Sequence, residues 1–360
     1  MRFHPRRVGR AVLCVFAVLA LSGIIQTAAA QSLASAPSVP FSERHRVQQN
    51  GGISRAANSA ITCVNPVVAG APSCNQAQRG AVARNGDYEM FYTDIDDDPN
   101  TYNSTSAELR IPDGARVTHA RLYWGGNLRV GEQKPHADNG RVLIAEPGGR
   151  YKVLRADSMI GHRVTDHDDA FTASADVTAL VRDSRQGAWT VADINVAMGH
   201  SEAGAWGGWT LVAAWEHPDA PLRDLVLYDG FRSPGAEGDV TIDIADLHAA
   251  PGASGRLGFV GYDGDRGSSG ETLSVTADRR APVRLSDAAN PAANVLNSTI
   301  SDLGTPVTTR TPAHHNTLGY DSDIMDLTPA LNRGAERLSV GFGGSGYHLG
   351  AVFLQADARG

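Results

Sequence analysis

The stretch Arg121-Leu-Tyr-Trp-Gly-Gly-Asn127 decides the fold class of this chain. Its first four residues predict a β-strand, because aromatic and other large apolar side chains suit the pleated backbone. The two glycines and the asparagine are residues that end strands, so we expect a turn there. Side chains alternate across a strand, which places Leu122 and Trp124 on one face and Tyr123 on the other. We expect Trp124 to lie in a core.

The same kind of pattern recurs from about residue 85 to the C-terminus. In Val240-Thr-Ile-Asp-Ile244 branched and polar side chains alternate, whereas Leu211–Trp215 is apolar throughout, as in a strand buried on both faces. The 39 glycines and 18 prolines fall mostly in the breaks. Helical patterns are few (Ser174–Arg182 and Asp321–Leu331), and alternating strand–helix units are absent. The sequence therefore predicts an all-β protein, either one large jelly-roll-like β-sandwich or two packed sandwiches, with one or two short helices.

Residues 1–30 have the features of a signal peptide. A basic segment, Arg6–Arg10, precedes the apolar stretch Ala11–Ile25, which is too short to span a bilayer comfortably. The small residues Ala28–Ala30 offer a cleavage point before Gln31. No second long apolar run follows. We therefore expect a secreted protein, extracellular or periplasmic, with no membrane insertion after signal removal.

Residues 31–84 are rich in Ala, Ser, Pro and Gly and lack sustained periodicity, so we predict a loosely packed lead-in. Two cysteines remain after signal removal, Cys63 and Cys74, and an even pair in an exported chain predicts a disulfide. Free thiols are the alternative. The β-sandwich domain is expected to span residues 85–360, with a sub-boundary near 216–222 where prolines break the pattern.

The net charge is −7 and the isoelectric point is near 5.9. Lys134 and Lys152 are the two lysines of the chain, and no basic stripe stands out. Nucleic acid is therefore not an expected partner.

Five separated segments, matching in order over roughly residues 85–356, together resemble an uncharacterised family of bacterial secreted surface proteins, in which a similar β-rich region often precedes Ig-like repeats. The segments are Arg121–Gly126, Gly207–Val212, Leu227–Phe231, Asn297–Ser301 and Asn316–Asp321. This resemblance implies a role at the bacterial envelope and transfers no activity. Three shorter pieces (Ala120–Tyr123, Ala175–Thr178 and Trp189–Val191) give a weaker likeness to carbohydrate-binding jelly rolls.

Two acidic loops are candidate calcium sites, because calcium is bound by several closely spaced oxygen ligands. The first alternates oxygen-bearing side chains at Asp94, Asp96, Asp98 and Asn100, although it lacks the glycine and terminal glutamate of an EF-hand. The second is glycine-rich and carries Asp263, Asp265 and Glu271. Solvated turns are the alternative for both loops. A third polar loop clusters His162 with Asp166, His167, Asp168 and Asp169, which suits a transition metal or an ordinary turn.

Trp206 lies among glycines, and we expect its indole to be exposed and available to stack on a sugar ring. Trp209 and Trp215, like Trp124, are expected in the core. Ser201 stands in a segment resembling a nucleophile elbow, but glycine is missing two positions later and no helix can follow.

These features favour a secreted, noncatalytic surface or binding protein that recognises polysaccharide or other envelope components and is stabilised by calcium. The alternative is a secreted hydrolase whose active site the sequence does not identify.

Overall fold

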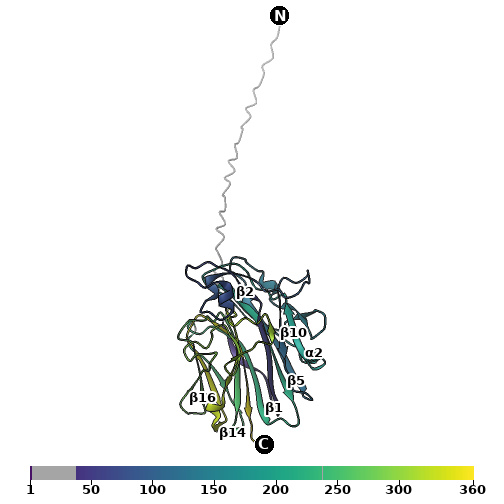
Figure 1. Ribbon diagram of the computed structural model, residues 1–360, viewed down its shortest axis with the longest axis vertical. Coiled ribbons are helices and arrows are strands. Elements are labelled where there is room, and N and C mark those ends of the chain that lie inside the picture. Colours follow the sequence, from purple (N-terminus) through teal and green to yellow (C-terminus); the bar gives the residue numbers. More distant parts are fainter. Residues whose placement is uncertain (2–37, 237) are drawn as a thin grey trace. The chain divides into compact units, whose positions relative to one another are not determined.

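The computed structural model describes Met1 and residues 38–236 and 238–360. The predicted signal peptide and its export function lie outside the described residues. The described residues 38–236 and 238–360 belong to one compact unit, and no boundary between units falls at 216–222. The unit is built on an eleven-stranded sheet (Figure 1). Its order is β19 (Thr305–Pro306), β18 (Ile300–Asp302), β21 (Tyr320–Asp326), β15 (Gly255–Tyr262), β24 (His348–Asp357), β12 (Leu222–Arg232), β1 (Val39–Ser59), β11 (Gly207–Glu216), β5 (Arg116–Asn127), β9 (Asp169–Asp176) and β8 (Ser158–Val164).

Two smaller sheets accompany the long one, and in Figure 1 β10 and β16 lie on opposite sides of β1. The five-stranded sheet contains β20 (Arg310–Thr311), β4 (Ser104–Leu109), β10 (Gly187–Ala192), β6 (Arg141–Ala145) and β7 (Lys152–Arg155). The four-stranded sheet contains β13 (Val240–Ile244), β23 (Leu338–Gly343), β16 (Thr272–Ala277) and β17 (Val283–Leu285). Two strand pairs, β2 (Ile61–Pro66) with β3 (Tyr88–Tyr92) and β14 (Ala249–Pro251) with β22 (Arg333–Ala335), and the short helices α1 (Cys74–Gln78), α2 (Thr178–Arg182) and α3 (Thr328–Leu331) complete the described elements.

Each smaller sheet buries one part of the long sheet. Trp124 and Trp209 from the long sheet share a core with Trp189 of the five-stranded sheet. Phe259 of β15 packs edge-on against Phe342 of the four-stranded sheet, with ring centroids 5.6 Å apart. Burial of these large rings is the main term that holds the layers together. The prediction of an all-β protein with sheets packed as sandwiches is confirmed, and Trp124 and Trp209 lie in the core as expected.

The opposite face of the long sheet forms a third core, because strands far apart in the sheet order face one another across it. Tyr262 of β15 lies against β9, where its hydroxyl is 3.2 Å from Thr172 Oγ1. It also contacts Tyr320 edge-on at 5.5 Å between ring centroids. Residues at the start of β24 are thereby brought beside the β8–β9 turn.

Three local predictions are wrong. Residues 39–59 are not a loose lead-in: they form β1, whose first half, Val39–Asn50, pairs with β12 and whose second half, Gly51–Ser59, pairs with β11. The Gly125–Gly126 pair does not turn, because it continues β5 between β9 and β11, where a side chain at Gly125 would meet the carbonyl of Phe171. Tyr320–Asp326 is a strand, so the helix predicted over Asp321–Leu331 is limited to α3. In each case pairing with neighbouring strands outweighs local propensity.

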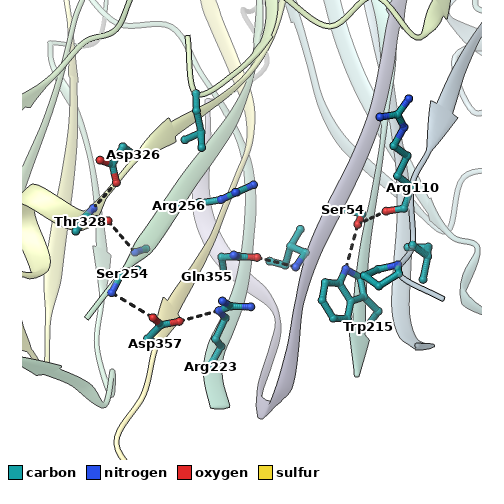
Figure 2. Close-up of a pocket in the computed structure, with 15 residues that line it drawn as sticks. Ser54, Arg110, Trp215, Arg223, Ser254, Arg256, Asp326, Thr328, Gln355 and Asp357 are labelled. Atoms are coloured by element: carbon teal, nitrogen blue, oxygen red, sulfur yellow. Dashed lines mark hydrogen bonds and ion pairs between the residues drawn. The ribbon is translucent and has the colours of Figure 1, made fainter. Parts of the chain in front are cut away.

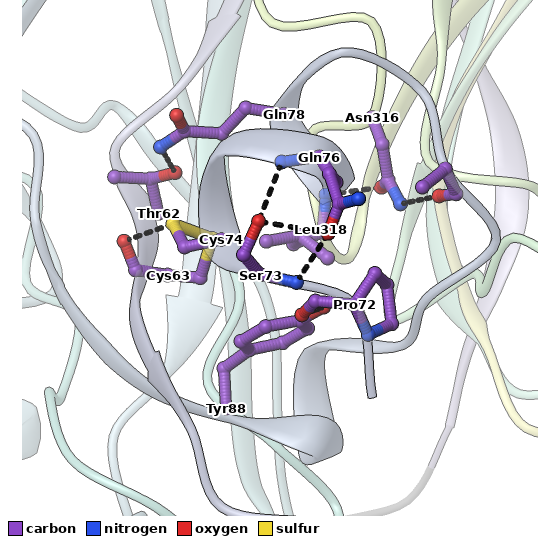
Figure 3. The surroundings of a disulfide bond; sticks show 11 residues. Thr62, Cys63, Pro72, Ser73, Cys74, Gln76, Gln78, Tyr88, Asn316 and Leu318 are labelled. Carbon is purple, nitrogen blue, oxygen red and sulfur yellow. Dashed lines mark hydrogen bonds between the residues drawn. A yellow bond between two sulfur atoms is a disulfide. The ribbon is translucent and has the colours of Figure 1, made fainter. Parts of the chain in front are cut away.

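The predicted disulfide between Cys63 and Cys74 is confirmed, and it ties α1 to β2 (Figure 3). Gln78 Nε2 donates to Thr62 Oγ1 at 3.0 Å, and Tyr88 Oη donates to the Pro72 carbonyl at 2.7 Å. The bond therefore closes a short loop whose ends are already held in place.

Replacing both cysteines with alanine is expected to lower the free energy of unfolding by about 2–3 kcal/mol, because the unfolded chain regains the entropy that the closed loop removes. Urea unfolding under nonreducing conditions measures the change. The matched control is Val64→Ala, since Val64 is exposed on the same strand. Equal midpoints for the double variant and the wild-type protein would contradict the prediction.

Candidate functional site

Trp206 is not exposed, and the expectation of an open stacking platform there is wrong. Its exposed fraction is 0%, and its ring lies 5.3 Å from the His348 ring and 5.5 Å from the Tyr262 ring, centroid to centroid. The neighbouring Gly319 lets the backbone pack directly against the indole: a side chain there, at φ +100°, would come within 2.6 Å of Trp206 Cβ. Trp206 is a core residue.

Trp215, rather than Trp206, is the tryptophan that a ligand can reach. It is half-buried at the end of β11 and lines a cleft of about 630 Å³ (Figure 2). The prediction that Trp215 belongs to the core is therefore wrong. The ring lies across β1 at Gly52, where a side chain would come within 2.7 Å of Trp215 Cζ2, so glycine is required beneath it. Trp215 Nε1 donates to Ser54 Oγ at 3.0 Å, which fixes the indole plane.

The floor of the cleft is polar and comes from three neighbouring strands of the long sheet. Gln355 lies between Trp215 and Asp326, which mark opposite ends of the cleft in Figure 2. Gln355 Oε1 accepts the amide N–H of Ile53 at 2.8 Å. The carboxamide is thereby oriented, and its Nε2 donor makes no hydrogen bond to the described residues.

The charged groups of the cleft differ in how far they are already paired. Arg223 Nε donates to Asp357 Oδ1 at 2.8 Å, and its Nη1 donates to the carbonyl of Gly51 at 2.7 Å. Arg256, by contrast, is exposed and approaches Asp302 only to 3.7 Å. Arg223 therefore helps to build the cleft, while Arg256 and Gln355 present donors to a ligand.

A second, acidic pocket of about 360 Å³ joins two of the predicted calcium ligands to the loop that carries Ser201. Asn85 Nδ2 donates to Asp263 Oδ1 at 2.8 Å, and His200 and Glu202 also line the pocket. Burial, together with the nearby charge of Asp265, raises the pKa of Asp263 well above its ordinary value. Burial also raises the pKa of Asp265 to about 7.

Glu271, the third predicted ligand of that loop, lies apart from the pocket lining. Its exposed fraction is 4%, and its Oε2 atom has no hydrogen-bond partner. Burial, and secondarily the charge of Asp265, raises its pKa to about 8. Glu271 is buried, whereas Asp263 and Asp265 are half-buried at the pocket.

In the loop from Asp94 to Asn100, each aspartate of the predicted calcium site accepts a hydrogen bond from a residue in or beside the loop. Asp98 Oδ1 accepts both the amide and the side chain of Asn100, at 3.0 and 2.7 Å. Asp96 Oδ1 accepts the amide of Asp98 at 3.0 Å, and Asp94 Oδ1 accepts the Ser104 hydroxyl at 2.6 Å. These hydrogen bonds hold the loop in its shape. Calcium binding at either acidic loop stays a prediction.

The third polar loop resolves into separate pairs. His162 Nε2 lies 2.6 Å from Asp169 Oδ1, whereas Asp168 turns inward to His348. Within residues 38–236 and 238–360, no three histidine, cysteine or acidic side chains come together in a way that could hold a metal ion. In the same residues no helix is long and apolar enough to cross a bilayer.

Sequence reasoning missed Trp215, Gln355 and Arg256. One local signal was available for Trp215: Glu216-His217-Pro218 follows it, so it is the last apolar residue of its strand and lies at the sheet end. Nothing local connects it to Gln355, which lies 140 positions later and reaches the cleft only through the pairing of β1, β12 and β24.

No family model and no curated protein matches this chain. Among solved structures it is similar to AerE from Microcystis aeruginosa, with 9% sequence identity and a TM-score of 0.20 over 70% of this chain and 81% of that one. It is also similar to a chain of the Sulfolobus Turreted Icosahedral Virus structure, with 10% identity and a TM-score of 0.20 over 70% of this chain and 85% of that one. Neither likeness bears on function.

Proposed function

We propose that this protein is a secreted binding protein of the bacterial envelope that recognises carbohydrate in the cleft beside Trp215. The observation that carries the proposal is an indole held in a fixed plane at the wall of a cleft whose floor offers unpaired donors. An exposed aromatic face suits the apolar face of a sugar ring, and fixed polar groups beside it select hydroxyl positions.

The charge of the cleft supports an acidic glycan over a neutral one. Both carboxylates on its wall already accept hydrogen bonds, Asp357 from Arg223 and Asp326 from the amide of Thr328 at 2.9 Å. The Arg256 guanidinium is the least engaged charge. A uronic acid carboxylate would complete its hydrogen bonding, because a guanidinium pairs with a carboxylate through two parallel bonds.

Trp215→Ala is expected to weaken glycan binding by about tenfold or more, which corresponds to roughly 1.4 kcal/mol. The measurement is a glycan array that includes neutral and uronic-acid polysaccharides, followed by calorimetric titration of the glycans retained. The matched control is Phe91→Ala, since Phe91 is an exposed aromatic residue on β3 that does not line the cleft.

Folding of the variants is checked by circular dichroism before the binding measurements. Binding of no glycan by the wild-type protein would reject carbohydrate recognition. Equal affinities for Trp215→Ala and Phe91→Ala would show that any glycan site lies elsewhere on the surface.

A further inference from the structure

Three buried polar side chains that take no part in the Trp215 cleft form a continuous hydrogen-bonded chain. Ser233 Oγ lies 2.6 Å from His348 Nδ1, and His348 Nε2 lies 2.8 Å from Asp168 Oδ2. The exposed fractions of Ser233, His348 and Asp168 are 6%, 6% and 7%. A hydroxyl, an imidazole and a carboxylate in this order are the components of an activated serine nucleophile.

The three residues come from segments that only the rolled long sheet brings together. Ser233 directly follows β12, His348 begins β24, and Asp168 directly precedes β9. The imidazole is held between two aromatic rings, with centroids 5.3 Å from Trp206 and 5.3 Å from Phe231. This packing fixes the ring plane, so the two ring nitrogens keep their separate partners.

The carboxylate decides which nitrogen carries the proton. An ionised aspartate only accepts hydrogen bonds, so His348 Nε2 is the protonated nitrogen and Nδ1 keeps its lone pair. Burial raises the pKa of Asp168, but the hydrogen bonds from His348 and Thr165 outweigh burial, and the net pKa is lowered. Nδ1 is therefore the atom available to accept the Ser233 hydroxyl proton.

We propose that Ser233 is the nucleophile of an esterase that acts on small O-acyl esters, with His348 as general base and Asp168 as a positioning residue. Ser233 Oγ bonds to the acyl carbon while its proton moves to His348 Nδ1. The ester C–O bond then breaks, and the leaving alkoxide takes that proton. In the second half, water adds to the acyl carbon through the same base, the acyl–Oγ bond breaks, and Ser233 recovers its proton.

The position of Ser233 limits the substrate. It is followed by Pro234 and then by the exposed residues Gly235 and Ala236, so the nucleophile lies just below a surface turn. With so little of Ser233 exposed, an acetyl-sized acyl group fits the site better than a long chain. Ser201 is not equivalent: its Oγ accepts the amide of Gly204 at 3.1 Å, and among the described residues no histidine side chain hydrogen-bonds to it.

The first test needs no variant. The wild-type protein is incubated with a small fluorophosphonate and the labelled peptide is mapped by mass spectrometry. Covalent modification at Ser233 supports the proposal. Absence of labelling in the folded protein, or labelling confined to other serines, overturns it.

Turnover of p-nitrophenyl acetate gives the second test. Ser233→Ala and His348→Gln are expected to lower kcat/KM by at least ~10²-fold, as for loss of a nucleophile or its base, while Ser201→Ala leaves it unchanged. For Asp168→Asn, ¹⁵N NMR of the His348 ring is expected to show the proton moved from Nε2 to Nδ1, with a matching loss of turnover. Equal turnover for Ser233→Ala and Ser201→Ala would overturn the proposal. These outcomes do not depend on whether the Trp215 cleft binds glycan.

Discussion

Trp209→Ala is expected to lower the free energy of unfolding by about 3–5 kcal/mol, the largest loss of any single substitution considered for this protein. Trp209 is fully buried, and its Nε1 donates to Thr105 Oγ1 at 2.8 Å. Thr105 belongs to β4 of the five-stranded sheet, so the indole bridges two layers. Removing it leaves a cavity in the shared core and a buried hydroxyl that has lost its donor.

Urea unfolding followed by far-UV circular dichroism measures this loss. Trp209→Phe separates most of the apolar contact from the hydrogen bond, because the phenyl ring keeps much of the contact, loses part of the ring volume and cannot donate; a loss of about 1–2 kcal/mol is expected for it. Val153→Ala, at an exposed position of β7, serves as the surface control and is expected to stay within about 0.5 kcal/mol of the wild-type protein. A loss below 1 kcal/mol for Trp209→Ala would show that the two sheets do not depend on this contact.

The strands could be predicted from sequence because their signal is local. Alternation in Val240–Ile244 and the apolar run in Leu211–Trp215 each report burial within a few residues, and both segments lie in strands. β1 escaped prediction because its signal is weak: Val39–Ser59 carries many polar side chains whose burial depends on β11 and β12. Its first half, Val39–Asn50, pairs with β12 and its second half, Gly51–Ser59, pairs with β11, so partners far along the chain satisfy the backbone of a largely polar strand.

The candidate sites were harder to predict, because residue type does not reveal exposure. Trp206 and Trp215 are the same side chain nine positions apart, yet one fills the third core and the other lines a cleft. The hydrogen-bonded chain of Ser233, His348 and Asp168 was harder still to predict, because Ser233 and His348 are separated by 115 positions in the sequence. Pairing of β12 with β24 places these two side by side, and the rolling of the long sheet brings Asp168, beside β9, to them; no local pattern encodes either.

Glu271→Gln is expected to make the stability of the protein less dependent on pH between about 5 and 9. The pKa of Glu271 is raised from its ordinary value of 4.5 to about 8, first by burial and then by the charge of Asp265. The folded state therefore binds this proton more tightly than the unfolded state does. The stabilisation is fully present below the unfolded pKa and is lost as the pH rises through about 8.

Glutamine resembles the protonated acid in shape and carries no charge at any pH, so the variant avoids the cost of ionising a side chain that is only 4% exposed. The melting temperature of the wild-type protein should fall between pH 5 and pH 9, and that of Glu271→Gln should fall less. At pH 9 the free energy of unfolding of the variant should exceed that of the wild-type protein by an amount on the order of a few kcal/mol. Glu336→Gln is the matched control, because the Glu336 side chain is 76% exposed and its replacement should leave the pH profile as in the wild-type protein. Parallel profiles for wild type and Glu271→Gln would mean that Glu271 ionises in the folded state as readily as in the unfolded chain, which its burial without a partner at Oε2 argues against.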